Sequence, residues 1–246
     1  MDLKYNKLCT AEAGAGPEIY EVEDLDHLAI TVRSKFINSP LEGFSNDEYS
    51  YFIDTSTEYS CLKVLKTPGP DSFITWADRD LDGMASSIAS YGNMIIIGSY
   101  SDNKVWLFDI TNSWDPPIEV YTASYPSNVT SVAITDSAAY IALKNGTMKI
   151  LNVSAFPTVT TEPDDTFPGQ LWNLQATGTY LMGTYNDDVR IFNISYPYSL
   201  YYVGDHDYGG DEVIRDMVVT NGGHIYLITE YSLEIIRFVN TSTIIP

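Results

Sequence analysis

The segment VRIFNIS, Val189 to Ser195, has two near copies in the same chain, VWLFDIT at Val105 to Thr111 and MKILNVS at Met148 to Ser154. Each copy begins with mainly apolar residues, as buried strands do, and ends in Asp or Asn, then Ile or Val, then Ser or Thr. We call this segment the signature. A pattern that recurs within one chain indicates a repeat protein, because each copy specifies the same local structure.

The signature recurs at nearly constant spacing. Its fifth position is occupied, at spacings of 43, 43, 41 and 44 residues, by Lys66, Asp109, Asn152, Asn193 and Arg237. Two strand-like segments separated by Gly, Asn, Asp or Ser turns precede most signatures, and a fourth segment follows. Four antiparallel strands in about 40 to 45 residues are the sequence pattern of one β-propeller blade.

The sequence therefore predicts an all-β fold, a five-bladed β-propeller with four-stranded antiparallel blades. The predicted parts are an N-terminal arm, 1–16, and a single propeller domain, 17–246, with blade repeats at approximately 27–77, 78–124, 125–167, 168–210 and 211–246 plus 17–25. The last repeat ends after its third strand, whereas Glu18 to Asp24 resembles a fourth strand. We predict that this N-terminal strand completes the last blade, Ile19 to Val22 beside Leu233 to Phe238, and so closes the ring.

The first repeat contains an insertion, Lys35 to Glu48, between its first two strands. Insertions in repeat proteins usually form surface loops, and such loops often bind partners. The apolar residues Phe36, Leu41 and Phe44 would then either dock onto their own blade or contact a partner.

These units resemble the repeats of LVIVD-repeat β-propeller proteins, in which a strand is followed by Asp-Ile/Val-Ser and a turn that contains Pro. The matching segments are Asp109-Ile110-Thr111, Asn152-Val153-Ser154 and Asn193-Ile194-Ser195, followed by Pro116, Pro157 and Pro197. The first and last units depart from this pattern, because they have Lys66 and Arg237 in place of Asp or Asn at the fifth position. The resemblance implies a secreted or cell-surface module, and it carries over no catalytic residues.

The chain has 246 residues, of which 33 are acidic and 13 basic, for a net charge of -20. Such a charge opposes binding to nucleic acid, because that affinity depends on neutralising phosphates with Lys and Arg. No apolar run reaches the length of about 18 residues that a membrane helix needs, so no membrane insertion is predicted. The acidity fits either a soluble surface or cation binding.

Acidic residues concentrate in the predicted turns between fourth and first strands, around Asp26, Asp78 and Asp205. In DRDLDG, the carboxylates of Asp78, Asp80 and Asp82 alternate before a glycine, as at the start of a calcium loop. An EF-hand is excluded, because Ala89 stands where the bidentate Glu belongs. The segment fits either a simpler calcium loop or a solvated acidic turn, and no other cofactor is predicted.

Several residues help to predict whether the protein is extracellular. Asn-x-Ser/Thr glycosylation motifs occur at Asn128, Asn145, Asn152, Asn193 and Asn240. They favour an extracellular or cell-surface glycoprotein, although the chain starts without the apolar segment of a signal peptide. Cys9 and Cys61 either form one disulfide or are two free thiols.

Two functions fit these observations. The first is a non-catalytic interaction or structural module that binds a protein or glycan partner, within a homo-oligomer or a surface assembly. The second is a five-bladed glycoside hydrolase-like enzyme that uses Asp26, Asp82 and Asp211, since glycosidases need paired carboxyl groups at a fixed separation. The acidic residues lie mostly in predicted turns rather than in first strands, and this placement favours the binding module.

Overall fold

The computed structural model describes the backbone of residues 2–4, 7–12, 16–24, 27–33, 40–45, 49–55, 59–69, 72–112, 115–207, 213–219, 224–229 and 231–237. Its side chains are described from residue 49 onward, with gaps. The chain forms two compact units, Met1–Asn128 and Val129–Pro246.

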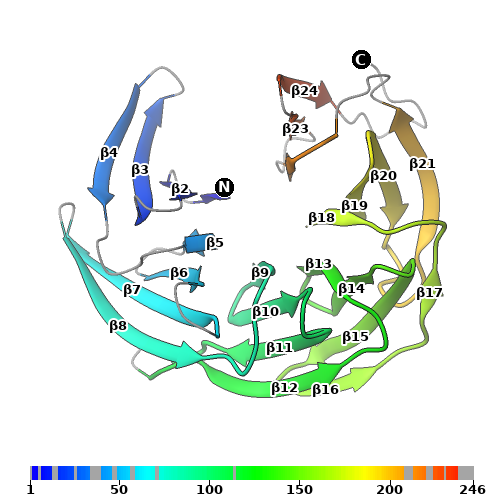
Figure 1. The fold of residues 1–246 in the computed structure, drawn as a ribbon, viewed down its shortest axis with the longest axis horizontal. Helices are drawn as coiled ribbons and strands as arrows, with labels where there is room; N and C mark the ends of the chain where they lie inside the picture. The colour runs from blue at the N-terminus through cyan, green and yellow to red at the C-terminus, as the bar shows by residue number, and fades with distance from the viewer. Residues whose placement is uncertain are drawn as a thin grey trace. The chain divides into compact units, whose positions relative to one another are not determined.

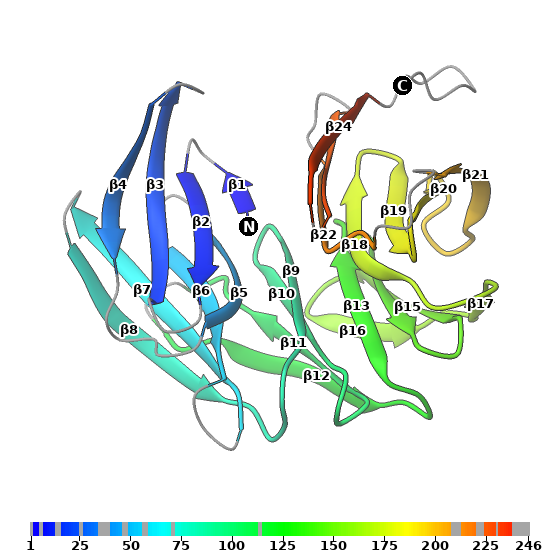
Figure 2. The same ribbon diagram turned by 45° about the horizontal axis from the view of Figure 1, so that its top comes forward.

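The first unit contains three antiparallel sheets, each made of strands consecutive in sequence (Figures 1 and 2). The strands of the first sheet are β1 (Asp2–Lys4), β2 (Lys7–Glu12), β3 (Gly16–Asp24) and β4 (His27–Arg33). Those of the second are β5 (Pro40–Ser45), β6 (Tyr49–Asp54), β7 (Cys61–Gly69) and β8 (Ser72–Asp80). Those of the third are β9 (Ser87–Tyr91), β10 (Met94–Ser99), β11 (Lys104–Asp109) and β12 (Ile118–Ser124).

The second unit also contains three sheets. The first consists of β13 (Val129–Ile134), β14 (Ala138–Leu143), β15 (Thr147–Ala155) and β16 (Thr158–Thr161), with β17 (Asp165–Thr166) also paired to β15. The second consists of β18 (Trp172–Thr177), β19 (Tyr180–Tyr185), β20 (Asp188–Asn193) and β21 (Tyr201–Asp207). The third consists of β22 (Asp216–Val219), β23 (His224–Ile228) and β24 (Leu233–Arg237).

The prediction of an all-β fold built from five propeller blades is confirmed. Five sheets each contain one signature, in β7, β11, β15, β20 and β24, as their third strand. Pairing is antiparallel throughout these sheets, and the described ranges contain no helix. Accordingly, no helix long and apolar enough to cross a membrane occurs in the part of the chain that is described.

The prediction that an N-terminal strand completes the last blade was wrong. Strand β3 contains Ile19 to Val22, and it pairs with β2 on one edge and β4 on the other. Because each edge of a strand pairs with one neighbour, β3 has no edge left for β24. The prediction overlooked β1 and β2, which form a hairpin in the segment expected to be an arm. Strand β24 pairs with β23 in a sheet that has three strands among the described residues.

The boundary of the first blade was also wrong. The segment His27–Arg33, expected as its first strand, is β4 and forms a hairpin with β3. The first-strand position is taken by β5, which lies within the predicted insertion and pairs with β6. Leu41 and Phe44 therefore belong to a strand rather than to a loop. Their side chains, and Phe36 as a whole, lie outside the described part of the structure.

The end of the signature forms the same turn in three blades. The side-chain oxygen at the fifth position accepts a hydrogen bond from the backbone N–H two residues later, over 2.8 Å for Asp109, 3.1 Å for Asn152 and 2.8 Å for Asn193. The intervening residue, Ile110, Val153 or Ile194, is buried, and its N–H donates to the turn between the first two strands. The repeated Asp/Asn-Ile/Val-Ser/Thr pattern thus forms a side-chain turn, at which β11 and β20 end, whereas β15 continues to Ala155.

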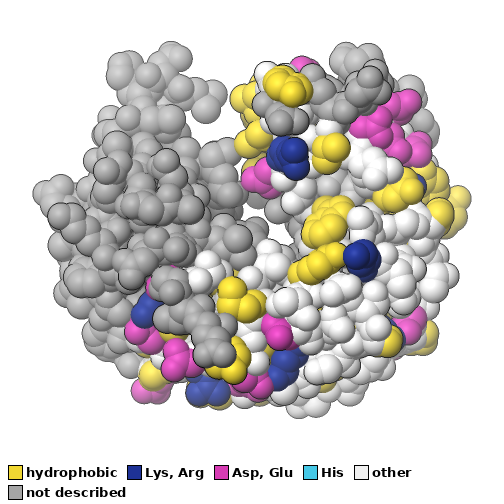
Figure 3. Space-filling view, viewed as in Figure 1, with side chains coloured by type: hydrophobic (Ala, Val, Ile, Leu, Met, Phe, Trp, Pro, Cys, Tyr) yellow, Lys and Arg dark blue, Asp and Glu magenta, His cyan; other side chains and the backbone are white. Residues whose placement is uncertain are grey.

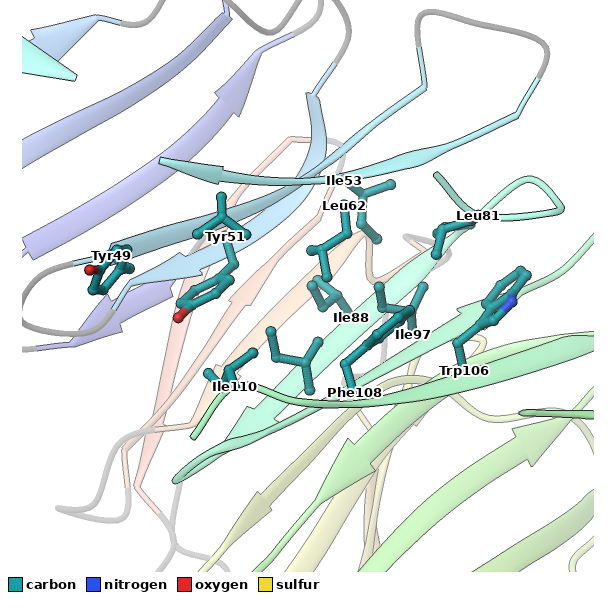
Figure 4. Close-up of a cluster of buried hydrophobic side chains, with 13 residues drawn as sticks. Tyr49, Tyr51, Ile53, Leu62, Leu81, Ile88, Ile97, Trp106, Phe108 and Ile110 are labelled. Carbon is teal, nitrogen blue, oxygen red and sulfur yellow. The ribbon is translucent and has the colours of Figure 1, made fainter. Parts of the chain in front are cut away.

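Neighbouring sheets pack through apolar residues. Figure 4 shows one such contact, where Tyr51 and Leu62 of the β5–β8 sheet face Ile97 and Phe108 of the β9–β12 sheet. In the second unit, corresponding clusters join the β13–β16 sheet to the β18–β21 sheet and the latter to β22–β24. Each blade is therefore apolar on both faces, which explains why the signatures read as nearly continuous hydrophobic segments.

Candidate functional site

The second position of the signature carries a hydrogen-bond donor that contacts an aspartate in three blades. Lys63 Nζ lies 2.7 Å from Asp78 Oδ2, and Trp106 Nε1 lies 2.9 Å from Asp82 Oδ1. Lys149 forms an ion pair with Asp164. Asp78 and Asp164 lie in the fourth strand of the same blade or just after it, whereas Asp82 lies in the connection that enters the blade of Trp106 from the preceding one. Asp78, Asp82 and Asp164 thus have a structural role that the sequence did not predict.

Two of the three predicted calcium residues, Asp78 and Asp82, contact hydrogen-bond donors in the structure. Asp78 and Asp80 lie in β8 rather than in a turn, and only Asp82 lies in the connection to β9. Asp82 also bonds to Lys104, and the hydrogen bonds from Lys104 and Trp106 lower the pKa of its carboxyl group. Among the side chains that the structure describes, no three metal-ligating groups lie together. Calcium binding by Asp78, Asp80 and Asp82 stays a prediction.

Asp102 fixes the same connection from the neighbouring turn. Its Oδ2 accepts hydrogen bonds from Met84 N at 2.7 Å, Ser99 Oγ at 2.9 Å and Ser101 Oγ at 2.8 Å. These bonds lower the pKa of Asp102, the bond from Met84 N most strongly. A Cβ on Gly83 would lie 2.9 Å from Asp102 Oδ2, so glycine permits the close approach. This network holds the β8–β9 connection against the β10–β11 turn.

The β18–β21 blade departs from this pairing scheme. Its second-position residue, Arg190, lies directly across from Asp205 in the register of β20 and β21. The guanidinium nevertheless donates to the carbonyl oxygen of Pro168 and lies over the ring of Tyr185, 3.8 Å from the ring centroid. Gly169 has a φ of +84°, and a Cβ there would overlap the Tyr185 ring at 2.0 Å. The connection before β18 is thus shaped to hold this stacked pair.

Carboxylates gather beside the stacked pair. Asp188 lies across from Asp207, and this pair is two residues along the strands from the pair of Arg190 and Asp205. Partial burial and the charges of Asp187, Asp205 and Asp207 raise the pKa of Asp188 against the opposing effect of Arg190. The predicted acidic turn around Asp205 therefore begins as part of β21. Acidic residues of β20 and of the turn before it thus lie near acidic residues of the fourth strand in this sheet.

Tyrosines complete this surface. Tyr202 packs against the buried ring of Phe192 at 5.8 Å between centroids, yet it remains 46% exposed. Burial and the neighbouring carboxylate of Asp205 raise the pKa of Tyr202. Tyr201, on the same strand, is 73% exposed. We call Tyr185, Asp188, Arg190, Tyr202 and Asp205 the aromatic–acidic cluster. Figure 3 shows acidic side chains gathered over the end of β21, with exposed hydrophobic ones beside them.

Of these residues, only Asp205 was predicted from the sequence; Tyr185, Arg190 and Tyr202 were not. A usable signal was present, because Arg190 occupies the second position of the signature and Asp205 follows on the next strand. The adjacent aromatic pair Tyr201-Tyr202 on a fourth strand was a second signal. The stacking of Arg190 on Tyr185 depends on the path of Pro168 and Gly169, which the repeat pattern does not specify.

The glycosylation motifs differ in how their side chains are used. Asn128 Nδ2 donates to Tyr100 O at 2.6 Å, and Asn152 Nδ2 donates to Glu162 Oε1 at 3.0 Å. Asn145 is exposed in the turn between β14 and β15. Asn193 belongs to the side-chain turn of its signature, and Asn240 lies outside the described residues. Glycosylation of these positions stays a prediction.

Cys61 is a free, buried cysteine, and burial raises the pKa of its thiol to about 12. Of the two alternatives for the cysteines, the structure therefore has the free thiol at Cys61. Asp26 and Asp211, named for the hydrolase alternative, lie outside the described residues.

Comparison with known proteins identifies the architecture but no family. No protein-family model matches the chain, and no curated protein matches it. Among solved structures, the periplasmic gluconolactonase PpgL of Pseudomonas aeruginosa is 11% identical with a TM-score of 0.79, over 97% of this chain and 80% of that one. A functionally unknown protein from Desulfotomaculum acetoxidans is 10% identical with a TM-score of 0.79, over 97% and 78%. The computationally designed protein Ika8 is 12% identical with a TM-score of 0.65, over 95% and 69%. At these identities the likeness shows the fold alone.

Proposed function

We propose that the chain is a non-catalytic binding module of an extracellular or cell-surface assembly and that it holds a glycan at the aromatic–acidic cluster. One observation carries the proposal. In this blade Arg190 turns from the facing Asp205 to Tyr185, and carboxylates gather beside an exposed tyrosine. The similarity of the repeats to LVIVD-repeat propellers and the five glycosylation motifs support the extracellular setting.

The chemistry of the cluster suits a sugar. The face of an aromatic ring such as Tyr202 packs against the C–H face of a pyranose, with an apolar body and a polar tip on the same side chain. The carboxylates of Asp188 and Asp205 accept hydrogen bonds from sugar hydroxyls, and Arg190 donates to ring or hydroxyl oxygens. Donated hydrogen bonds would also stabilise the charged form of Asp188, whose pKa is raised by burial and by the neighbouring carboxylates.

A hydrolase is the second candidate, and it receives less support from the described residues. Of the three proposed acids, only Asp82 is described, and its lowered pKa favours the ionised form. A general acid needs a raised pKa, so Asp82 is poorly suited to that role. The fold likeness to a periplasmic gluconolactonase nevertheless makes lactone hydrolysis the assay of choice for this alternative.

The test is binding of the purified protein to a panel of neutral and basic oligosaccharides. For any glycan of the panel that binds, we expect Tyr202→Ala and Asp205→Asn each to weaken the affinity by about tenfold. A change of that size corresponds to the loss of roughly one good hydrogen bond or stacking contact. Tyr91→Ala is the matched control, because Tyr91 is 45% exposed on β9 and lies in a different blade.

Equal loss in all three variants would contradict a site at the cluster. Failure of the whole panel to bind would contradict the glycan class. Turnover of a gluconolactone or a polysaccharide that Asp82→Asn abolishes would replace the binding module by an enzyme.

A further inference from the structure

The glycosylation motifs among the described residues differ in how the fold uses the asparagine. A glycan is bulky and is attached to the side-chain nitrogen, Nδ2, so this nitrogen must face open solvent. Asn145 is exposed, whereas Asn128, Asn152 and Asn193 are half-buried. The four motifs are therefore not equivalent as acceptors.

Two of the half-buried motifs use the side-chain nitrogen within the fold. Asn128 Nδ2 donates a hydrogen bond to Tyr100 O at 2.6 Å, and Asn152 Nδ2 donates to Glu162 Oε1 at 3.0 Å. The hydroxyl of Thr130, which completes the first of these motifs, is buried and bonds to two backbone carbonyl oxygens. A sugar on either nitrogen would have to displace its acceptor from the place that it occupies in the fold.

Asn193 lies between two tyrosines. It is the last residue of β20, and it lies directly across from Tyr180 of β19 on one side and from Tyr201 of β21 on the other. Residues directly opposite each other share one face of the sheet, so both tyrosine side chains extend to the same side as Asn193. A sugar at this position would have to fit between two large side chains.

Asn145 lies in the turn that joins β14 to β15, and the backbone holds this turn in place. Gly146 N donates to Leu143 O at 2.9 Å, and Gly146 has a φ of +83°. Gly146 is itself buried, and its carbonyl oxygen accepts a hydrogen bond from Phe167 N at 2.8 Å. Asn145 contributes only its Oδ1, which accepts from Thr147 N at 3.1 Å. All of these contacts lie within the second unit.

We infer that Asn145 carries an N-linked glycan and that Asn128, Asn152 and Asn193 carry none in the folded protein. Within the described part of the chain, Asn145 Nδ2 makes no hydrogen bond, so a glycan there displaces no contact of the fold. The inference rests on the extracellular setting of the proposed function, since the Asn-x-Ser/Thr motif is an acceptor in secreted proteins.

The attachment leaves the turn intact. A bond forms between Asn145 Nδ2 and C1 of the first sugar, and the bond from that carbon to the diphosphate of a lipid-linked oligosaccharide breaks. The lipid diphosphate leaves, and one amide proton is lost to solvent. The Oδ1 of Asn145 is unchanged by this step and continues to accept the hydrogen bond from Thr147 N.

The test is site-resolved mass spectrometry of the full chain secreted in folded form from a eukaryotic host that adds N-glycans. Enzymatic removal of a glycan converts its Asn to Asp, so each peptide reports the occupancy of its own motif. We expect carbohydrate at Asn145 and its loss in Asn145→Asp, which keeps the acceptor of the turn. Thr147→Ala should also abolish it, whereas Thr147→Ser keeps the hydroxyl of the motif and should retain it. Asn193→Asp is the matched control and should leave the carbohydrate unchanged.

Folded protein without carbohydrate at Asn145 would overturn the inference. Carbohydrate at Asn128, Asn152 or Asn193 in as many molecules as at Asn145 would also overturn it, because the contacts described above would then exclude nothing. The aromatic–acidic cluster lies on another blade, so Asn145→Asp should still bind any oligosaccharide that the wild type binds. This inference and the proposed function can therefore fail separately.

Discussion

The pKa values of two aspartates, Asp188 and Asp82, are shifted in opposite directions by their surroundings. Asp82 is exposed, and hydrogen bonds from Lys104 and Trp106 lower its pKa. Asp188 is partly buried beside three other carboxylates, so its pKa is raised. Hydrogen bonds to the charged form favour ionisation, whereas burial and like charges oppose it. The sequence alone does not separate the two residues, because the difference lies in which groups face each carboxylate.

This contrast predicts opposite pH dependences. With a raised pKa, native Asp188 holds its proton more tightly than the unfolded chain does, so stability falls as pH rises through the window above the ordinary Asp value of about 4. Asp188→Asn should therefore raise the melting temperature at neutral pH, and this gain should vanish at acid pH. With a lowered pKa, Asp82 contributes stability above that value, and the contribution is lost as pH falls. Asp82→Asn should lower the melting temperature at neutral pH.

Thermal melts of both variants and wild type from acid to neutral pH measure these effects. A neutral-pH melting temperature that moves in the same direction in the two variants would refute the assigned environments.

At the scale of elements, the signature strand was well predicted because its information is local. The apolar positions specify a strand buried on two faces, and the Asp/Asn at the fifth position specifies the turn that ends it. The same reasoning gave wrong results for β3 and β5. Both strands pair with the next strand along the chain, and the residue pattern of β3 or β5 alone does not indicate this partner. Strand β3 resembles a fourth strand in sequence, but it pairs with β4, the next strand along the chain. Pairing partners depend on the whole chain, and a single strand pattern does not encode them.

The side-chain turn at the end of β20 gives an element-scale prediction. Asn193→Ala removes the oxygen that accepts the hydrogen bond from Ser195 N, and we expect a loss of roughly 0.5–1.5 kcal/mol in the free energy of unfolding. Asn193→Asp keeps an acceptor at the same place and should retain most of the stability. Urea unfolding of protein made in a host without N-glycosylation measures both. Wild-type stability in Asn193→Ala would mean that the signature repeats for a reason other than this turn.

At the scale of the whole molecule, the repeat period predicted the architecture, whereas composition predicted little about the site. The five signatures and their spacing were sufficient for the blades, because each blade is specified by its own residues. The first 33 residues carry no signature, and their sheet was not foreseen. The aromatic–acidic cluster is a departure from the repeat in one blade. Such departures are visible only after the paired positions of the other blades are known.

The net charge supports a last prediction, about calcium. With 33 acidic and 13 basic residues, the native chain repels itself, so added salt should raise the melting temperature by screening. NaCl and CaCl₂ at equal ionic strength should act almost alike if Asp78 and Asp82 remain with Lys63 and Lys104. A specific calcium site would instead stabilise the native state by mass action at low concentration. Asp80→Asn is the discriminating variant, because it removes the central carboxylate of DRDLDG and leaves both ion pairs. A calcium-specific rise in the melting temperature that Asp80→Asn abolishes would establish the calcium loop, and an equal response to the two salts would assign these carboxylates to their lysines.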